Sequence, residues 1–158
     1  MIQTRLIVAA LAVLVASCGS KGSVSLSAMV QNAEISVQQV ALGTELAGSF
    51  ELFLEVGPEA ESGSTVSLES FALVRASDQS TLVSPLTATP QGASFPLDVP
   101  KGGKRVVQFD VGSDALLDAA TKDAICAEQV QIVGAVRDTL SGGDVTPVRS
   151  IALSASGC

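Results

Sequence analysis

Clustered carboxylates are the side chains of this sequence with the clearest potential for chemistry. They are Asp110, Asp114, Asp118 and Asp123, and Asp114 and Asp118 are spaced by one helical turn. Several carboxylate oxygens can hold Ca²⁺, and a carboxylate pair can hydrolyse a glycosidic bond. However, the spacing does not match an EF-hand loop, and aspartates near a helix start also interact favourably with the helix dipole. We therefore predict no metal site and no cofactor, and interpret the cluster as the polar start of a helix.

Missing residue types restrict the function further. The chain of 158 residues contains no histidine, tryptophan or tyrosine. Without histidine there is no Ser-His-Asp or Cys-His catalysis and no histidine-ligated metal. Without Trp and Tyr, the aromatic platforms that stack on nucleobases are nearly absent, and a net charge of −7 lacks the basic footprint of a nucleic-acid binder. These absences favour a binding protein over an enzyme and exclude nucleic acid as the expected partner.

The first eighteen residues have three zones. Arg5 supplies a positive charge, residues 6–16 (LIVAALAVLVA) form an uninterrupted apolar run, and small residues precede Cys18. The apolar run is too short to span about 30 Å of hydrocarbon as a helix, which needs about 20 apolar residues. The order of the zones is typical of a secretory signal peptide, and a buried core helix is the alternative.

The residues Val15-Ala16-Ser17-Cys18 resemble the lipobox of bacterial lipoproteins: an aliphatic residue, two small residues and a cysteine. The resemblance implies cleavage before Cys18, a diacylglycerol anchor on its sulfur, and often a further acyl chain such as palmitate on the new amino group. Two or three acyl chains are enough for stable membrane anchoring, whereas one chain is not. The resemblance also implies a location in the bacterial cell envelope. Because Gly19 is not acidic, it favours the outer membrane in a Gram-negative organism.

This interpretation divides the chain into three parts. They are a lipoprotein signal peptide at 1–17, a lipidated tether at 18–23 and a folded domain at 24–158. Cleavage removes Arg5, so the mature chain is more acidic than the whole, and attachment should depend on acyl chains rather than on a basic patch.

Two further cysteines remain once Cys18 is lipidated. They are Cys126 and the last residue, Cys158. An even pair in an exported domain favours a disulfide, and two free buried thiols are the alternative. A bond between them would fix a C-terminus that would otherwise fray.

Period-two alternation of apolar residues predicts an all-β domain after Val24. The candidate strands are 24–30, 35–42, 49–56, 66–74, 95–99, 107–111, 129–137 and 145–155, with Gly- and Pro-containing turns between them. This rhythm predicts a single antiparallel β-sandwich, similar to immunoglobulin-like modules, although their Cys…Trp…Cys signature is absent. A barrel is the alternative.

Two local features interrupt the alternation. The apolar phase flips within Val66–Val74, which predicts a β-bulge near Glu69-Ser70. Ser113 followed by good helix formers predicts a short helix over Ser113–Ala120, with Ser113 as its N-cap.

The last hairpin makes a testable prediction of register. If Gly142-Gly143 is a two-residue turn, Ile132 pairs with Leu153 and Val130 pairs with Ala155. The same register places Cys126 and Cys158 on opposite faces. A disulfide therefore requires the strand pairing to break at or before Gly157.

Taken together, the sequence predicts a non-enzymatic envelope lipoprotein that acts as a binding or assembly module. Its expected partners are the membrane, through acyl chains on Cys18, and another envelope protein that contacts an edge strand or a loop. A small-ligand or calcium-binding envelope protein is the alternative function, and an enzyme comes third.

Overall fold

The alternation of apolar and polar residues determines most of the strands. The structure is a computed structural model that describes residues 25–158, and Phe50, Leu52, Leu54 and Val56 are buried in it as alternate residues of one strand. The elements are β1 (Leu26–Val40), β2 (Gly43–Val56), β3 (Ser64–Arg75), β4 (Thr81–Gln91), β5 (Leu97–Val99), β6 (Lys104–Ser113), α1 (Ala119–Ala127), β7 (Val130–Asp138) and β8 (Val145–Arg149). The prediction of an all-β domain with one short helix is confirmed.

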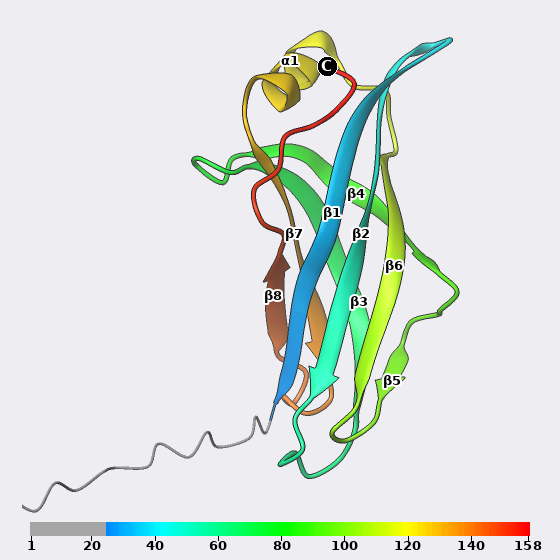
Figure 1. Cartoon of the computed structure of the whole chain (residues 1–158), viewed down its shortest axis with the longest axis vertical. Helices are drawn as coiled ribbons and strands as arrows, with labels where there is room; N and C mark the ends of the chain where they lie inside the picture. The colour runs from blue at the N-terminus through cyan, green and yellow to red at the C-terminus, as the bar shows by residue number, and fades with distance from the viewer. Residues whose placement is uncertain (1–24) are drawn as a thin grey trace, which may run out of the picture.

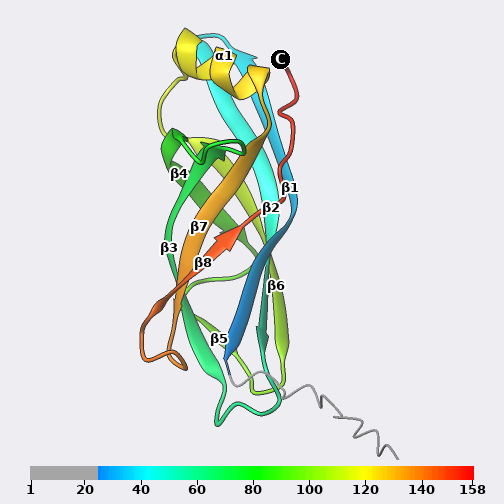
Figure 2. The same ribbon diagram turned by 90° about the vertical axis from the view of Figure 1, so that its left-hand side faces the viewer.

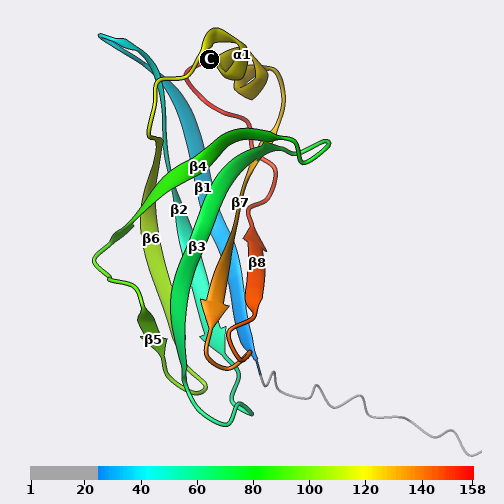
Figure 3. The same ribbon diagram turned by 180° about the vertical axis from the view of Figure 1, so that it is seen from behind.

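The strands form one antiparallel sheet that curls into a half-barrel (Figure 1). Its order is β1-β2-β6-β4-β3-β7-β8, and β5 pairs with β3. The strand that joins the two halves is β4. Its residues Thr81–Leu86 pair with β3, and Leu86–Gln91 pair with β6; Figure 3 shows it running between these strands. A sandwich needs two separate sheets, so the immunoglobulin-like sandwich is corrected to a single curled sheet.

The inside of the curl is filled by a cluster of phenylalanines. Phe50 and Phe109 lie opposite each other on β2 and β6, with ring centroids 4.8 Å apart in a stacked arrangement. Phe71 packs against both rings, and Phe95 packs against Phe109. Burial of these large side chains is the main stabilising contribution that the pattern of the sequence supplies.

Several local predictions need correction. The two strands expected at 24–30 and 35–42 are replaced by a single strand, β1 (Leu26–Val40), whose register shifts between Gln31 and Glu34. The helix starts later than expected because Asp118, not Ser113, is its N-cap. Ser113 is the last residue of β6, and its hydroxyl accepts a hydrogen bond from the backbone N–H of Leu46. The bulge near Glu69-Ser70 is confirmed by a register shift between Leu68 and Phe71.

The predicted register of the last hairpin is wrong. Arg137 pairs with Val145 and Gly134 pairs with Val148, so the connection is a longer loop rather than a two-residue turn. Val130 forms an isolated bridge with Leu153 instead of pairing with Ala155. The predicted break before Gly157 is confirmed, because β8 ends at Arg149 and the tail then moves to β1.

The signal peptide at 1–17, the lipidation site Cys18 and the tether at 18–23 lie outside the described residues. From residue 25 onward, the structure contains no helix that is both long and apolar enough to cross a bilayer.

Candidate functional site

The two ends of the sheet carry different features. We call the end where β1 begins at Leu26 the near end, and the end where β1 and β2 turn at Val40–Gly43 the far end. The near end holds the loop between β7 and β8, and the far end holds α1 and the C-terminus (Figures 1 and 2). The 15 residues of β1, at about 3.3 Å each, separate the two ends by roughly 45–50 Å.

The aspartate cluster of the sequence does not form a common site. Asp110 accepts a hydrogen bond from the Gln91 side chain at 2.7 Å, and Asp114 accepts one from the Thr87 hydroxyl. Asp118 caps α1, and the hydrogen bond from the backbone N–H of Thr121 lowers the pKa of its carboxyl. Within residues 25–158, no group of three or more Cys, Asp or Glu side chains is arranged to hold a metal ion.

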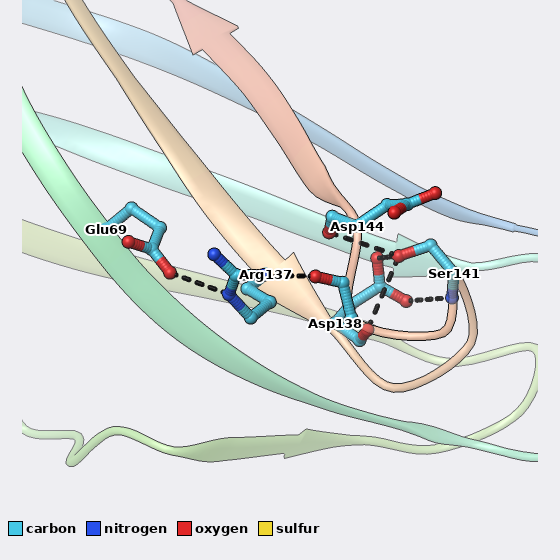
Figure 4. Close-up of polar contacts among 6 residues, drawn as sticks. Glu69, Arg137, Asp138, Ser141 and Asp144 are labelled. Carbon is cyan, nitrogen blue, oxygen red and sulfur yellow. Dashed lines mark hydrogen bonds and ion pairs between the residues drawn. The ribbon is translucent and has the colours of Figure 1, made fainter.

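The most enclosed polar group lies at the near end, in the loop between β7 and β8 (Figure 4). Asp138 is only 2% exposed, and its carboxylate accepts hydrogen bonds from the backbone N–H groups of Leu140 and Ser141. The hydroxyls of Ser141 and Ser64 also donate to it, at 2.7 and 3.2 Å. These bonds explain why the loop is longer than a two-residue turn: the side chain of Asp138 takes over the role of a turn.

Arg137, the residue before Asp138, points to the other side of the strand. Its guanidinium donates to Glu69 on β3, with Nε and Oε1 2.8 Å apart, and to the carbonyl oxygen of Gly143 in the loop (Figure 4). Arg137 and Asp138 therefore both hold the loop in place. We interpret this cluster as structural rather than catalytic.

This interpretation predicts the effect of Asp138→Ala. We expect the substitution to lower the free energy of unfolding by about 1–3 kcal/mol, because the donors around it lose their acceptor in a buried site. Urea unfolding followed by far-UV circular dichroism measures the change. The control is Asp144→Ala in the same loop, whose side chain is exposed and whose loss should change stability by less than about 0.5 kcal/mol. Equal losses in the two variants would contradict the structural role.

The far end carries an open groove instead of a polar network. A groove of about 280 Å³ lies between the first half of β4 and the segment 113–118, next to the first turn of α1. Its apolar lining includes Leu82, Val83, Pro85, Leu116 and Leu117. One edge of Thr81–Pro85 in β4 pairs with β3. The opposite edge has no strand partner, because β6 pairs with β4 only from Leu86 onward.

Two leucines at the far end are exposed. Leu42, at the turn between β1 and β2, is 87% exposed, and Leu116 is 48% exposed. Leu116 lies directly against the backbone of this turn: a Cβ added to Gly43 would meet its Cδ1 at 3.0 Å. Leu116 thus adjoins the turn that carries Leu42 and also lines the groove, and we call Leu42, Leu116 and the groove the far-end surface. Adjacent exposed apolar residues are the kind of feature that marks an interaction site.

The remaining predicted site residues also meet at the far end. Cys126 lies on α1, and its Sγ is 2.11 Å from that of Cys158, with Cα atoms 5.6 Å apart. This arrangement is consistent with the predicted disulfide.

Comparison with known protein families, with characterised proteins and with solved structures found no match to this chain. The function therefore has to be argued from the site itself.

The far-end surface is hard to predict from the sequence. The charges of Asp114 and Asp118, which flank the groove, do not indicate an apolar surface. In the sequence, Leu42 is the last apolar residue of a predicted strand, and Leu116 is part of a predicted short helix. Their exposure depends on where the chain turns, and that is set by contacts between distant segments.

Proposed function

We propose that this chain is a membrane-anchored envelope lipoprotein whose β-domain is a non-enzymatic binding module, and that the far-end surface contacts a partner protein. The observation that carries the proposal is the position of Leu42 and Leu116, at the end of the sheet opposite to the start of β1. If Cys18 is lipidated, the short tether keeps the near end close to the bilayer. The far end then extends roughly 45–50 Å away from it.

The chemistry of the partner follows from the surface. Burying an exposed leucine at a turn tip against another protein surface is favourable by roughly 25 cal/mol per Å² of apolar area removed from water. The groove beside it is open and short, and an apolar side chain from the partner would fill it next to Leu116 and Leu117. We therefore propose a protein partner with an apolar contact residue, rather than a small molecule held in an enclosed cavity.

Calcium binding, the alternative function, receives no support from the carboxylates. Asp110, Asp114 and Asp118 are each engaged with a different neighbour, and they do not converge. A calorimetric titration of the protein with Ca²⁺ is expected to give no binding heat, and a saturable heat would reinstate this alternative.

Site-specific photo-crosslinking in cells tests the proposed surface. We expect a crosslinker placed at Leu42 or at Leu116 to give a discrete adduct with one envelope protein. The matched control is Val145 at the near end, which is 46% exposed, close to the 48% of Leu116. Equal labelling from Val145, or no adduct from either leucine, would contradict the proposal.

Introducing charges in place of the two leucines should weaken binding of the partner. Combining Leu42→Glu with Leu116→Glu is expected to reduce the crosslinked fraction from a neighbouring probe at Ala115 by about tenfold or more, because changing a central contact residue costs about 2 kcal/mol or more. Membrane retention and the unfolding midpoint should be unchanged, since both side chains are exposed. A variant that still forms the adduct fully would show that binding occurs elsewhere.

A further inference from the structure

The C-terminal tail, Leu153–Cys158, fills a seam between β1 and β7. Leu153 exchanges two backbone hydrogen bonds with Val130 of β7, at 2.8 and 2.9 Å. Three residues later, Ser156 accepts from the N–H of Val37 at 2.8 Å and donates to the carbonyl of Ile35 at 2.9 Å. Figures 1 and 2 show the tail running towards α1, and the hydrogen bonds above place it between β1 and β7. The tail therefore joins the two margins of the curled sheet, in the way an added strand would.

The seam fits the tail closely. The side chains of Leu153 and Ala155 pack against the core. Gly157 has a φ of +76°, and a Cβ at this position would lie 2.2 Å from the carbonyl oxygen of Val37. A side chain at residue 157 would therefore push the tail out of the seam.

The tail is connected to the rest of the domain at two points. At its start, the tail follows Ser150, which is hydrogen-bonded to Ile132 of β7. The N–H of Ser150 donates to the carbonyl oxygen of Ile132 at 2.9 Å, and the N–H of Ile132 donates to the hydroxyl of Ser150 at 3.0 Å. Between this anchor and Leu153 lies Ile151, which is 81% exposed. On the other side the chain ends in the bond from Cys158 to Cys126. The disulfide therefore adds a covalent link to the hydrogen bonds and apolar contacts that hold the tail in the seam.

We propose that the seam between β1 and β7 is an acceptor site for an extended segment, and that the Cys126–Cys158 bond keeps the chain's own tail in it. After reduction of this bond, the seam accepts the tail of a second copy of the chain. The occupant is argued from the fit: a second copy presents the same six residues, with the same backbone groups and the same glycine. Exchange of identical elements is a low-cost route to a symmetric dimer. This inference does not depend on the proposed partner of the far-end surface.

The redox steps balance with simple thiol reagents. A dithiol such as dithiothreitol transfers two electrons and two protons to the disulfide; Cys126 and Cys158 become thiols, and the reagent becomes a cyclic disulfide. A small disulfide such as oxidised glutathione then reverses the change by taking up the same electrons and protons. In the exchanged dimer, the new bond joins Cys126 of one copy to Cys158 of the other.

Amide hydrogen exchange tests the release of the tail. The full chain with Cys18→Ser, in which only one intramolecular disulfide can form, is compared with and without dithiothreitol in dilute solution, where the copies do not exchange tails and a released tail leaves the seam empty. We expect the N–H groups of Val37 and Val130, which donate to the tail, to exchange about tenfold faster or more after reduction. The N–H of Val56, which donates to Gly103 elsewhere in the sheet, is the internal control and should not change. Unchanged protection of Val37 and Val130 would overturn the proposal, and so would an equal acceleration of all three amides.

Isotope mixing tests the second copy as the occupant. Unlabelled and ¹⁵N-labelled protein are reduced together, concentrated, reoxidised with oxidised glutathione and digested without reduction. We expect Cys126–Cys158 peptide pairs in which one peptide is labelled and the other is not, and pairs of uniform label only would overturn the proposal. The matched control is Gly157→Ala, whose tail cannot seat. Mixed pairs should be lost in this variant, and their persistence would show random thiol oxidation instead of exchange through the seam.

Discussion

Replacing Phe109 with alanine is expected to lower the free energy of unfolding by about 3–5 kcal/mol, the usual range for removing a fully buried phenylalanine. Phe109 has no exposed area and contacts the rings of Phe50, Phe71 and Phe95. Small domains have only about 5–15 kcal/mol of stability, so this loss is a large part of the total. The three remaining rings come from β2, β3 and the loop between β4 and β5, and they cannot all move inward to fill the space.

The measurement is urea unfolding followed by far-UV circular dichroism, because the chain has no Trp or Tyr for a fluorescence signal. The matched control is Phe53→Ala. Phe53 lies on the opposite face of β2 from Phe50, is half-buried, and has Lys104 Nζ 5.8 Å from its ring centroid. Its loss should cost about 1 kcal/mol or less. If the two variants lose the same stability, the aromatic cluster is not the centre of the core.

The contrast between these phenylalanines was readable in the sequence, because alternation within 49–56 already separates Phe50 from Phe53. The same rule located β6 and β7, and the phase flip located the bulge of β3. These are local properties, determined by a few consecutive residues and by the two-residue period of a strand. They therefore do not depend on contacts with distant parts of the chain.

The features that the sequence did not reveal depend on distant contacts or on competing local choices. The strand β4 was missed because Pro85 and Pro90 interrupt it and few of its residues are buried. It is nevertheless the strand that turns two half-sheets into one. The helix starts after Asp118 instead of Ser113, because Ser113 is paired with Leu86 of β4 as the last residue of β6. Likewise, the two-residue turn expected at Gly142-Gly143 is replaced by a longer loop, which the buried carboxylate of Asp138 holds by hydrogen bonds.

The candidate site likewise has features that can be predicted from the sequence and features that depend on the fold. The pairing of Cys126 with Cys158 could be predicted from the number of cysteines together with the expectation that the domain is exported. The tail that carries Cys158 into the seam could not, since only the break in pairing was implied. The exposure of Leu42 is a consequence of the fold, as hydrophobicity alone favours a buried position.

Cys18→Ser is expected to move the protein from the membrane fraction to the soluble fraction almost completely. The residues Val15-Ala16-Ser17-Cys18 resemble a lipobox, so Cys18 is the expected site of acylation. A net charge of −7 also opposes attraction to anionic lipids. Two or three acyl chains anchor stably, and serine cannot carry the thioether that holds the first two.

Cell fractionation with metabolic labelling by a palmitate analogue measures both consequences of Cys18→Ser. The wild type should be labelled and membrane-bound, and the variant should be neither. The matched control is Ser17→Ala, which keeps a small residue beside the cysteine and should preserve label and retention. If Cys18→Ser stays in the membrane fraction without label, the anchor is a different one. The far end would then no longer be expected to point away from the membrane, and the proposed orientation of Leu42 and Leu116 would lose its basis.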